Sequence, residues 1–281
     1  MSDPLVSTAW LAEHLEAPDV RIIDASWYFP QEERDAKAEY ALAHIPGAVF
    51  FDIDDIADET SSLPHMLPSA VKFASRVRKL GLGDGSRMVV YDQLGLRSAA
   101  RVWWTFRAMG HLDVVVLDGG LPKWIVEGRP ISDMPAPPRE RHFTPRLSYD
   151  LVRDLNQVRK ALETGREQVV DARPAGRFTG ETPEPRAGLR GGHMPGARNV
   201  PASDLLAPDG TMKSPQQLAE IFEKAGVDIN KPVVTTCGSG ITAAILALAL
   251  ARLGKERTAL YDGSWTEWGG REDTPVVTGE A

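Results

Sequence analysis

The chain has 281 residues, a formal net charge of -7 and a single cysteine. This length suits two domains of ordinary size. The acidic balance argues against a nucleic-acid partner, and one cysteine permits no intramolecular disulfide. The most apolar run, 241–251, is far shorter than the ~20 residues that cross a bilayer, so we expect no membrane partner. No basic and apolar leader opens the sequence, and we therefore expect a cytoplasmic location.

The first half of the chain alternates apolar segments with helical ones. Apolar residues bounded by turn residues predict strands, and an amphipathic pattern with a serine before it and a glycine after it predicts a helix. In chain order we expect a strand at 21–26, a helix at 69–80, a strand at 88–92, a helix at 99–109 and a strand at 114–117.

The second half repeats this series. The corresponding segments are a strand at 168–173, a helix at 214–225, a strand at 233–237, a helix at 242–253 and a strand at 258–262. Both halves also place a His-x-Pro-Gly-Ala sequence after the first strand, at 44–48 and 193–197. So many elements in the same order indicate an internal duplication.

Strands that alternate with helices predict an α/β fold. We expect two tandem domains, each a mostly parallel sheet flanked by helices. The predicted boundaries are an N-terminal domain at 1–133, a linker at 134–149 and a catalytic domain at 150–281. The linker is placed where prolines cluster among charged residues, at Pro135, Pro137, Pro138 and Pro145.

Cys237 stands where a nucleophile would be expected. It ends a predicted strand and begins Cys-Gly-Ser-Gly-Ile-Thr, which leads into a helix. Ligands of open α/β sheets bind beyond the carboxyl ends of the strands. Gly238 and Gly240 allow the backbone to curl, and the following helix turns its N–H groups toward the same point. Such a loop would stabilise a thiolate or a persulfide anion, although an isolated free cysteine is more often a small core residue.

The first repeat provides a comparison for this loop. Asp92 occupies the position of the cysteine, so we expect the first domain to be non-catalytic in its own loop. Phosphatases of similar layout require an arginine six residues after the cysteine, to grip the phosphoryl group. Ala243 stands there instead, which disfavours a phosphatase.

From about residue 10 to 270 these residues resemble the tandem-domain rhodanese family. Within it, Cys237-Gly238-Ser239-Gly240 looks like the 3-mercaptopyruvate sulfurtransferase branch, because thiosulfate sulfurtransferases typically have Cys-Arg-Lys-Gly there. The family match implies that Cys237 is the nucleophile. It also implies that Gly238, Gly240, Ile241 and Thr242 belong to the substrate-binding loop.

The resemblance assigns the other site residues. Arg177 and Arg186 would hold the carboxylate and carbonyl of mercaptopyruvate, a task for which a planar charged fork is suited. Asp54, His65 and the hydroxyl of Ser239 would form a relay like that of serine proteases. If so, the active site lies between the two domains. Without the family match, His65 and the two arginines would be interpreted as ordinary polar loop residues.

These assignments imply a double displacement. Cys237 takes sulfur from 3-mercaptopyruvate, releases pyruvate and passes the sulfur to thioredoxin, a small thiol or cyanide. We expect no cofactor and no metal, since no closed ligand set or nucleotide-binding motif is present. Two alternatives remain open: a thiosulfate sulfurtransferase with an unusual loop, and a non-catalytic rhodanese-like binding module.

Overall fold

The computed structural model describes residues 3–137 and 140–280, so Pro138 of the predicted linker lies outside the described residues. The chain forms two compact units. Unit 1 comprises 1–59, 67–148 and 207–212, and unit 2 comprises 60–66, 149–206 and 213–281. The bounds of these units differ from the predicted domain bounds in three places. The linker belongs to unit 1 up to residue 148, and the two halves of the chain each give one short segment to the other unit.

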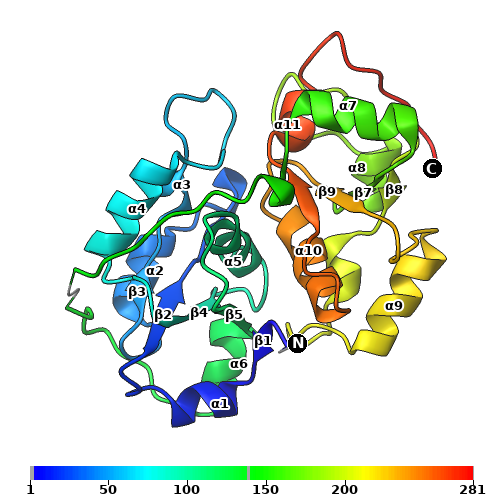
Figure 1. Cartoon of the computed structure of the whole chain (residues 1–281). Coiled ribbons are helices and arrows are strands. Elements are labelled where there is room, and N and C mark those ends of the chain that lie inside the picture. Colours follow the sequence, from blue (N-terminus) through cyan, green and yellow to red (C-terminus); the bar gives the residue numbers. More distant parts are fainter. Residues whose placement is uncertain (1–2, 138–139, 281) are drawn as a thin grey trace. The chain divides into compact units, whose positions relative to one another are not determined.

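Unit 1 contains a five-stranded sheet in the order β1-β5-β4-β2-β3 (Figure 1), and its neighbouring strands pair in parallel. Its elements are β1 (Leu5–Val6), α1 (Thr8–Glu13), β2 (Val20–Asp24), η1 (Pro30–Glu32), α2 (Ala36–Leu42), β3 (Val49–Phe50), α3 (Ile53–Ile56), α4 (Ala70–Lys79), β4 (Arg87–Tyr91), α5 (Ala99–Ala108), β5 (Val114–Leu117) and α6 (Gly120–Val126).

Unit 2 repeats this topology in the order β6-β10-β9-β7-β8, again with parallel pairs. Its elements are η2 (Tyr149–Leu151), β6 (Val152–Arg153), α7 (Leu155–Thr164), β7 (Gln168–Asp171), α8 (Ala175–Thr179), β8 (Arg198–Asn199), η3 (Ala202–Leu205), α9 (Pro215–Lys224), β9 (Val233–Thr236), α10 (Ala243–Arg252), β10 (Ala259–Tyr261) and α11 (Ser264–Trp268). The predicted α/β fold with two parallel sheets is confirmed.

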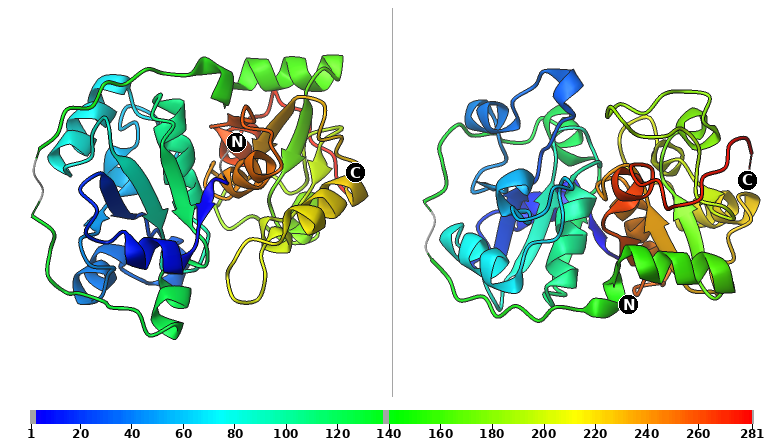
Figure 2. Two further views of the ribbon diagram at one scale, coloured as in Figure 1. Left: turned by 60° about the horizontal axis from the view of Figure 1, so that its bottom comes forward. Right: turned by 90° about the horizontal axis from the view of Figure 1, so that it is seen from above.

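Each sheet is covered on both faces, which is why the central strands β4, β5, β7 and β9 are almost entirely buried. In unit 1, Leu11 of α1 and Trp124 of α6 pack in one buried cluster, while Phe73 of α4 and Phe106 of α5 meet edge to face at 5.2 Å. In unit 2, α7 and α11 share a buried cluster with the strands, and α10 lies on the opposite face (Figure 2). These layers leave the carboxyl ends of the strands free to carry loops.

The helix boundaries follow from the residues that predicted them. Ser69 accepts a hydrogen bond from the Lys72 N–H at 3.2 Å and begins α4. Ser214 begins α9 in a capping box with Gln217. Gly81 and Gly226 follow the two helices at φ of 75° and 72°, a left-handed conformation that glycine adopts without strain.

Residues 143–148 of the predicted linker pack against the rest of unit 1. The Arg146 and Ser148 N–H groups donate to the backbone carbonyls of Met109 and Ala108, at 2.8 and 2.7 Å. Phe143 is only 1% exposed, and its ring lies 5.4 Å from that of Phe73. This segment therefore contributes to the core of unit 1. Within the described residues, no helix is long and apolar enough to cross a membrane.

Candidate active site

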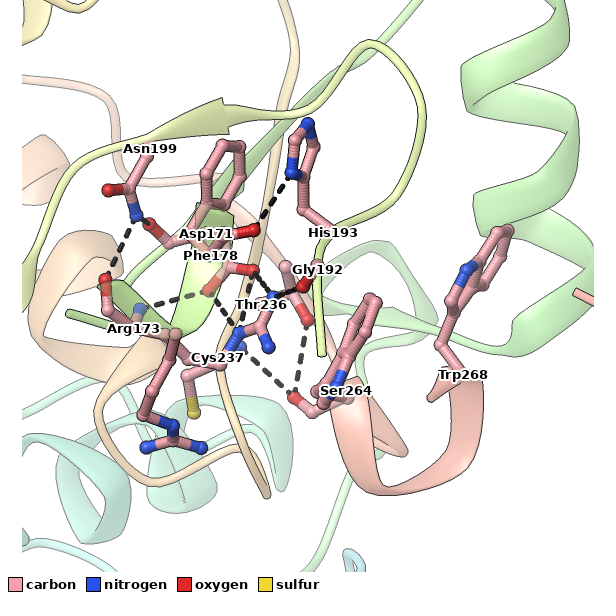
Figure 3. Close-up of polar contacts among 12 residues, drawn as sticks. Asp171, Arg173, Phe178, Gly192, His193, Asn199, Thr236, Cys237, Ser264 and Trp268 are labelled. Atoms are coloured by element: carbon pink, nitrogen blue, oxygen red, sulfur yellow. Dashed lines mark hydrogen bonds and ion pairs between the residues drawn. The ribbon is translucent and has the colours of Figure 1, made fainter. Parts of the chain in front are cut away.

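Cys237 follows β9 directly, at the carboxyl end of the second sheet, and is 2% exposed. Its N–H donates to the Ser264 hydroxyl at 3.3 Å, and its carbonyl accepts from the Trp265 N–H at 2.9 Å (Figure 3). The Gly238 carbonyl accepts both the N–H and the hydroxyl of Thr266, at 2.9 and 2.7 Å. The cysteine loop is therefore tied to α11, which fixes the position of the sulfur.

The remainder of the loop matches the predicted strand–loop–helix arrangement. Gly240 has a φ of 81°, Ile241 is 2% exposed, and Thr242 is the N-cap of α10. A helix of this length carries a partial positive charge at its first turn. The loop thus joins the cysteine to a helix end that favours negative charge.

The two predicted substrate-binding arginines both reach this loop. Arg177 lies on α8, which begins after Pro174, and Arg186 lies in the loop that follows. A Cβ atom placed on Gly238 would be 3.2 Å from Arg177 Nη2 and 3.8 Å from Arg186 Nη1. Two guanidinium groups thus converge beside the nucleophile, in space that a side chain at position 238 would enter.

Ser239 and His65 both contact Arg186. Arg186 Nη2 donates to the Ser239 hydroxyl and lies beside His65 Nε2, each at 3.4 Å. Ser239 is 4% exposed and His65 is 8% exposed, with a φ of 60°. The structure thus places Arg186 beside two of the three residues of the predicted relay.

Asp54, the acidic member of the predicted relay, belongs to unit 1, whereas His65 belongs to unit 2. Asp54 lies on α3, where its carboxylate accepts a hydrogen bond from Trp27 Nε1 at 2.9 Å and is exposed to solvent. This contact with Trp27 was not predicted from the sequence.

Sequence reasoning missed a buried ion network behind the arginines. Arg173 donates to Asp171 at 2.7 Å and to Glu184 at 2.8 Å, and these three side chains are each 1% exposed. Glu184 also accepts from Arg177 at 2.5 Å. Burial opposes the charge of Arg173, but the ion pairs with Asp171 and Glu184 outweigh it and raise the pKa of Arg173. The internal repeat contained a signal for this network: Arg173 corresponds to Ser26 in the first half, so the second half has a charged residue where the first half has a neutral one.

Ser264 is a second residue that sequence reasoning missed. It has a φ of 51°, which is strained for a residue with a side chain. The matching residue of unit 1 is Gly120, which adopts nearly the same φ of 54°. The serine hydroxyl accepts the Cys237 N–H and donates to the Tyr261 carbonyl at 2.8 Å. A non-glycine residue is thus kept in a glycine conformation where its hydroxyl supports the cysteine.

The matching loop of unit 1 is filled by its own side chain. The Asp92 carboxylate accepts hydrogen bonds from the N–H groups of Leu94, Arg97 and Ala99, at 2.9, 2.6 and 2.9 Å. The segment 207–212 covers this loop, since a Cβ atom on Gly95 would lie 3.1 Å from the Gly210 Cα. Three N–H groups of this loop are therefore already occupied by the side chain of Asp92. Among the residues that the structure describes, no three His, Cys, Asp or Glu side chains are grouped to hold a metal.

Comparison with known proteins identifies the fold and the repeat. The rhodanese-like domain model matches twice, at residues 7–127 and 154–271. The chain is 46% identical to human 3-mercaptopyruvate sulfurtransferase over 94% of this chain and 91% of that protein. The corresponding Escherichia coli K12 enzyme is 44% identical over 96% of both chains, and bovine thiosulfate sulfurtransferase is 45% identical over 94% of this chain and 91% of the relative.

A solved structure supports the same family assignment. The crystal structure of SseA from Escherichia coli, described as a 3-mercaptopyruvate sulfotransferase, superposes with a TM-score of 0.87 at 42% identity. The match covers 94% of this chain and 99% of that one. With two domain matches, relatives aligned over nearly their full length and a cysteine loop at the carboxyl end of the second sheet, the chain belongs to the tandem-domain rhodanese family of sulfurtransferases.

Proposed function

We propose that this protein transfers sulfur from 3-mercaptopyruvate to a thiol acceptor or cyanide through Cys237, with release of pyruvate. The observation that carries this proposal is the convergence of Arg177 and Arg186 on Gly238, next to the nucleophile. A 2-oxo acid presents a carboxylate and a carbonyl to such a pair, and charged planar forks bind these groups well. The relatives named 3-mercaptopyruvate sulfurtransferase support the same donor.

In the proposed first step, the Cys237 thiolate attacks the sulfur of the bound donor. An S–S bond forms, the C–S bond breaks, and its electron pair moves into the carbonyl to give the enolate of pyruvate. The enolate takes up the proton that the transferred SH group gives up. Arg186 and the Ser239 hydroxyl, which contact each other, would stabilise the enolate oxygen.

In the second step, the outer sulfur of the persulfide passes to an acceptor. The loop from Gly238 to Thr242 and the first turn of α10 would hold the persulfide anion, because helix N-termini favour negative charge. A thiolate of thioredoxin or of a small thiol then attacks the outer sulfur and restores the Cys237 thiolate. Cyanide would do the same and leave as thiocyanate.

The proposal for the relay is narrower. His65 and Ser239 would act together with Arg186, which contacts both. For Asp54 the proposal rests on the resemblance in sequence alone. Asp54→Asn should lower kcat for mercaptopyruvate if the relay operates, and an unchanged kcat would remove Asp54 from the mechanism.

Cys237→Ser tests the nucleophile. We expect pyruvate release from 3-mercaptopyruvate to fall by ~10⁴-fold or more, because the variant lacks the thiolate that accepts sulfur. The assay measures pyruvate with a thiol acceptor present, and intact-protein mass after donor alone should show one added sulfur atom on the wild type only. Undiminished turnover in the variant would refute the proposed role of Cys237.

Thiosulfate is the second candidate donor, because the bovine thiosulfate sulfurtransferase is as similar to this chain as the mercaptopyruvate enzymes are. Overall identity therefore does not separate the two donors. The neutral Gly238-Ser239 pair favours mercaptopyruvate, since a dianion would gain from cations at these positions. Side-by-side assays of both donors with cyanide as the common acceptor decide between them.

A further inference from the structure

Arg177 is one end of a chain of four alternating charges: Asp171, Arg173, Glu184 and Arg177. Exposure of the first three side chains is 1%, whereas that of Arg177 is 17%. Only the last member of the network thus reaches solvent. Charges buried to this degree are weakly screened, so their geometry is more strongly fixed than that of surface ion pairs.

The contacts with Glu184 use one defined edge of the Arg177 guanidinium. Its Nε donates to Glu184 Oε1 at 3.1 Å, and its Nη2 donates to Oε2 at 2.5 Å. A guanidinium carries five N–H groups in a planar fork. The side-on pair of Nε and Nη2 is therefore taken, and the end-on pair of Nη1 and Nη2 remains for a second planar anion. Nη2 is also the atom that lies 3.2 Å from the Cβ position of Gly238.

Glu184 is itself immobilised from the other side. Arg173 Nη1 donates to Glu184 Oε1 at 2.8 Å, and its Nη2 donates to Asp171 and to the Gly192 carbonyl (Figure 3 shows Arg173 with Asp171 and Gly192). The Arg173 guanidinium stacks over the Trp265 ring at 4.0 Å. The backbone N–H of Trp265 in turn donates to the Cys237 carbonyl. One buried framework thus supports both Arg177 and the cysteine loop.

We propose that Glu184 is a positioning residue that turns the end-on edge of Arg177 toward the carboxylate of the sulfur donor. This inference rests on the proposed function, in which Arg177 binds that carboxylate. Glu184 would act through Arg177 and not directly on the donor. Its two carboxylate oxygens fix the plane of the guanidinium, so that two parallel N–H bonds are pre-formed for a carboxylate beside Cys237.

The test is Glu184→Gln. A glutamine keeps the shape but replaces one acceptor oxygen by an NH₂ group, which repels the Arg177 N–H groups. We expect KM for 3-mercaptopyruvate to rise ~10- to 100-fold, the range of losing one charge-assisted hydrogen bond, while kcat changes by less than about threefold. Glu181→Gln, which removes the same charge from an exposed side chain three residues away, should leave both constants unchanged.

A second readout is independent of sulfur transfer. Iodoacetate carries a carboxylate and iodoacetamide does not, and both alkylate the single cysteine of the chain. The ratio of their rate constants with Cys237 should fall about tenfold or more in Glu184→Gln and also in Arg177→Gln. A loss of fold stability alone would change both reagents together and leave the ratio unaltered.

The two readouts separate this inference from the proposed function. A ratio that falls in Arg177→Gln but not in Glu184→Gln would overturn the positioning role while leaving Arg177 as the anion-binding group. A ratio unchanged in Arg177→Gln would count against the proposed function itself. If Glu184→Gln does not fold, Glu184→Asp keeps the charge but withdraws it by one methylene group. The same fall in ratio is then expected, and an unchanged ratio would overturn the inference.

Discussion

The two residues after Cys237 should select the sulfur donor, and exchanging them tests this directly. The perturbation is the double substitution Gly238→Arg and Ser239→Lys, which introduces the pair typical of the thiosulfate branch. A side chain at position 238 would begin 3.2 Å from Arg177 Nη2 and 3.8 Å from Arg186 Nη1. Any cation placed there stands beside two guanidinium groups.

The magnitude follows from these separations. Two unit charges about 4 Å apart repel by about 4 kcal/mol at an effective dielectric constant near 20. Long side chains move apart and water screens them, so about 1–2 kcal/mol per pair is a reasonable remainder. A dianionic donor offsets more of this repulsion than a monoanionic donor does, because it carries about one more negative charge. The ratio of kcat/KM for thiosulfate to that for 3-mercaptopyruvate should therefore rise ~10- to 100-fold.

The assay measures kcat/KM for both donors with cyanide as acceptor. Glu220→Gln with Glu223→Gln is the charge-matched control, because it also adds two units of net charge, on exposed positions of α9. The control should leave the donor ratio unchanged. If the loop exchange also leaves it unchanged in a folded protein, the argument that loop charge selects the donor is wrong.

Three further predictions concern stability. Burial raises the pKa of Asp24 above its ordinary value of 3.8, although hydrogen bonds from Ser26 and Tyr91 oppose this shift. The folded state therefore binds the proton of Asp24 more tightly than the unfolded state does, and the contribution of Asp24 to stability falls as the pH rises above about 4. In urea unfolding, Asp24→Asn should therefore gain stability relative to wild type as the pH rises from 4 to 7, and a pH-independent difference would contradict this expectation. Asp171→Asn removes an ion-pair partner of the buried Arg173 and should therefore be less stable than wild type at pH 7. In the same experiment, Phe143→Ala should lower the free energy of unfolding of unit 1 by about 3–5 kcal/mol. The control Ile131→Ala, at a 51% exposed position, should lower it by less than about 1 kcal/mol. A small loss for Phe143→Ala would mean that the linker does not contribute to the core.

The sequence by itself determined the duplication and the fold class. Periodicity and turn residues are local signals, and they placed α4, α5, α9 and α10 to within about one residue at each end. The same reasoning missed the edge strands β1, β3, β6 and β8, each of two residues. A strand of two residues has no period to detect, and it exists only because a neighbouring strand pairs with it.

The position of Cys237 could also be predicted, since a strand, two glycines and a helix start are consecutive in the chain. The partners of the site residues could not. Arg186 contacts His65, which lies 121 positions earlier in the sequence, and Trp265 stacks on Arg173 from a distant element. Such contacts depend on how elements pack, which local patterns do not encode.

Tertiary structure therefore decided which charges are buried and what each one holds. In the sequence, Arg173 ends a predicted strand and Glu184 is a polar residue with no assigned role, but folding encloses both side chains and they support Arg177. The segment 134–149 was predicted to be a linker because of its prolines, yet Phe143 is buried in the core of unit 1. The physical reason is common to both cases: the free energy of a buried ion pair or ring comes from its surroundings, and these are assembled from residues far apart in the chain.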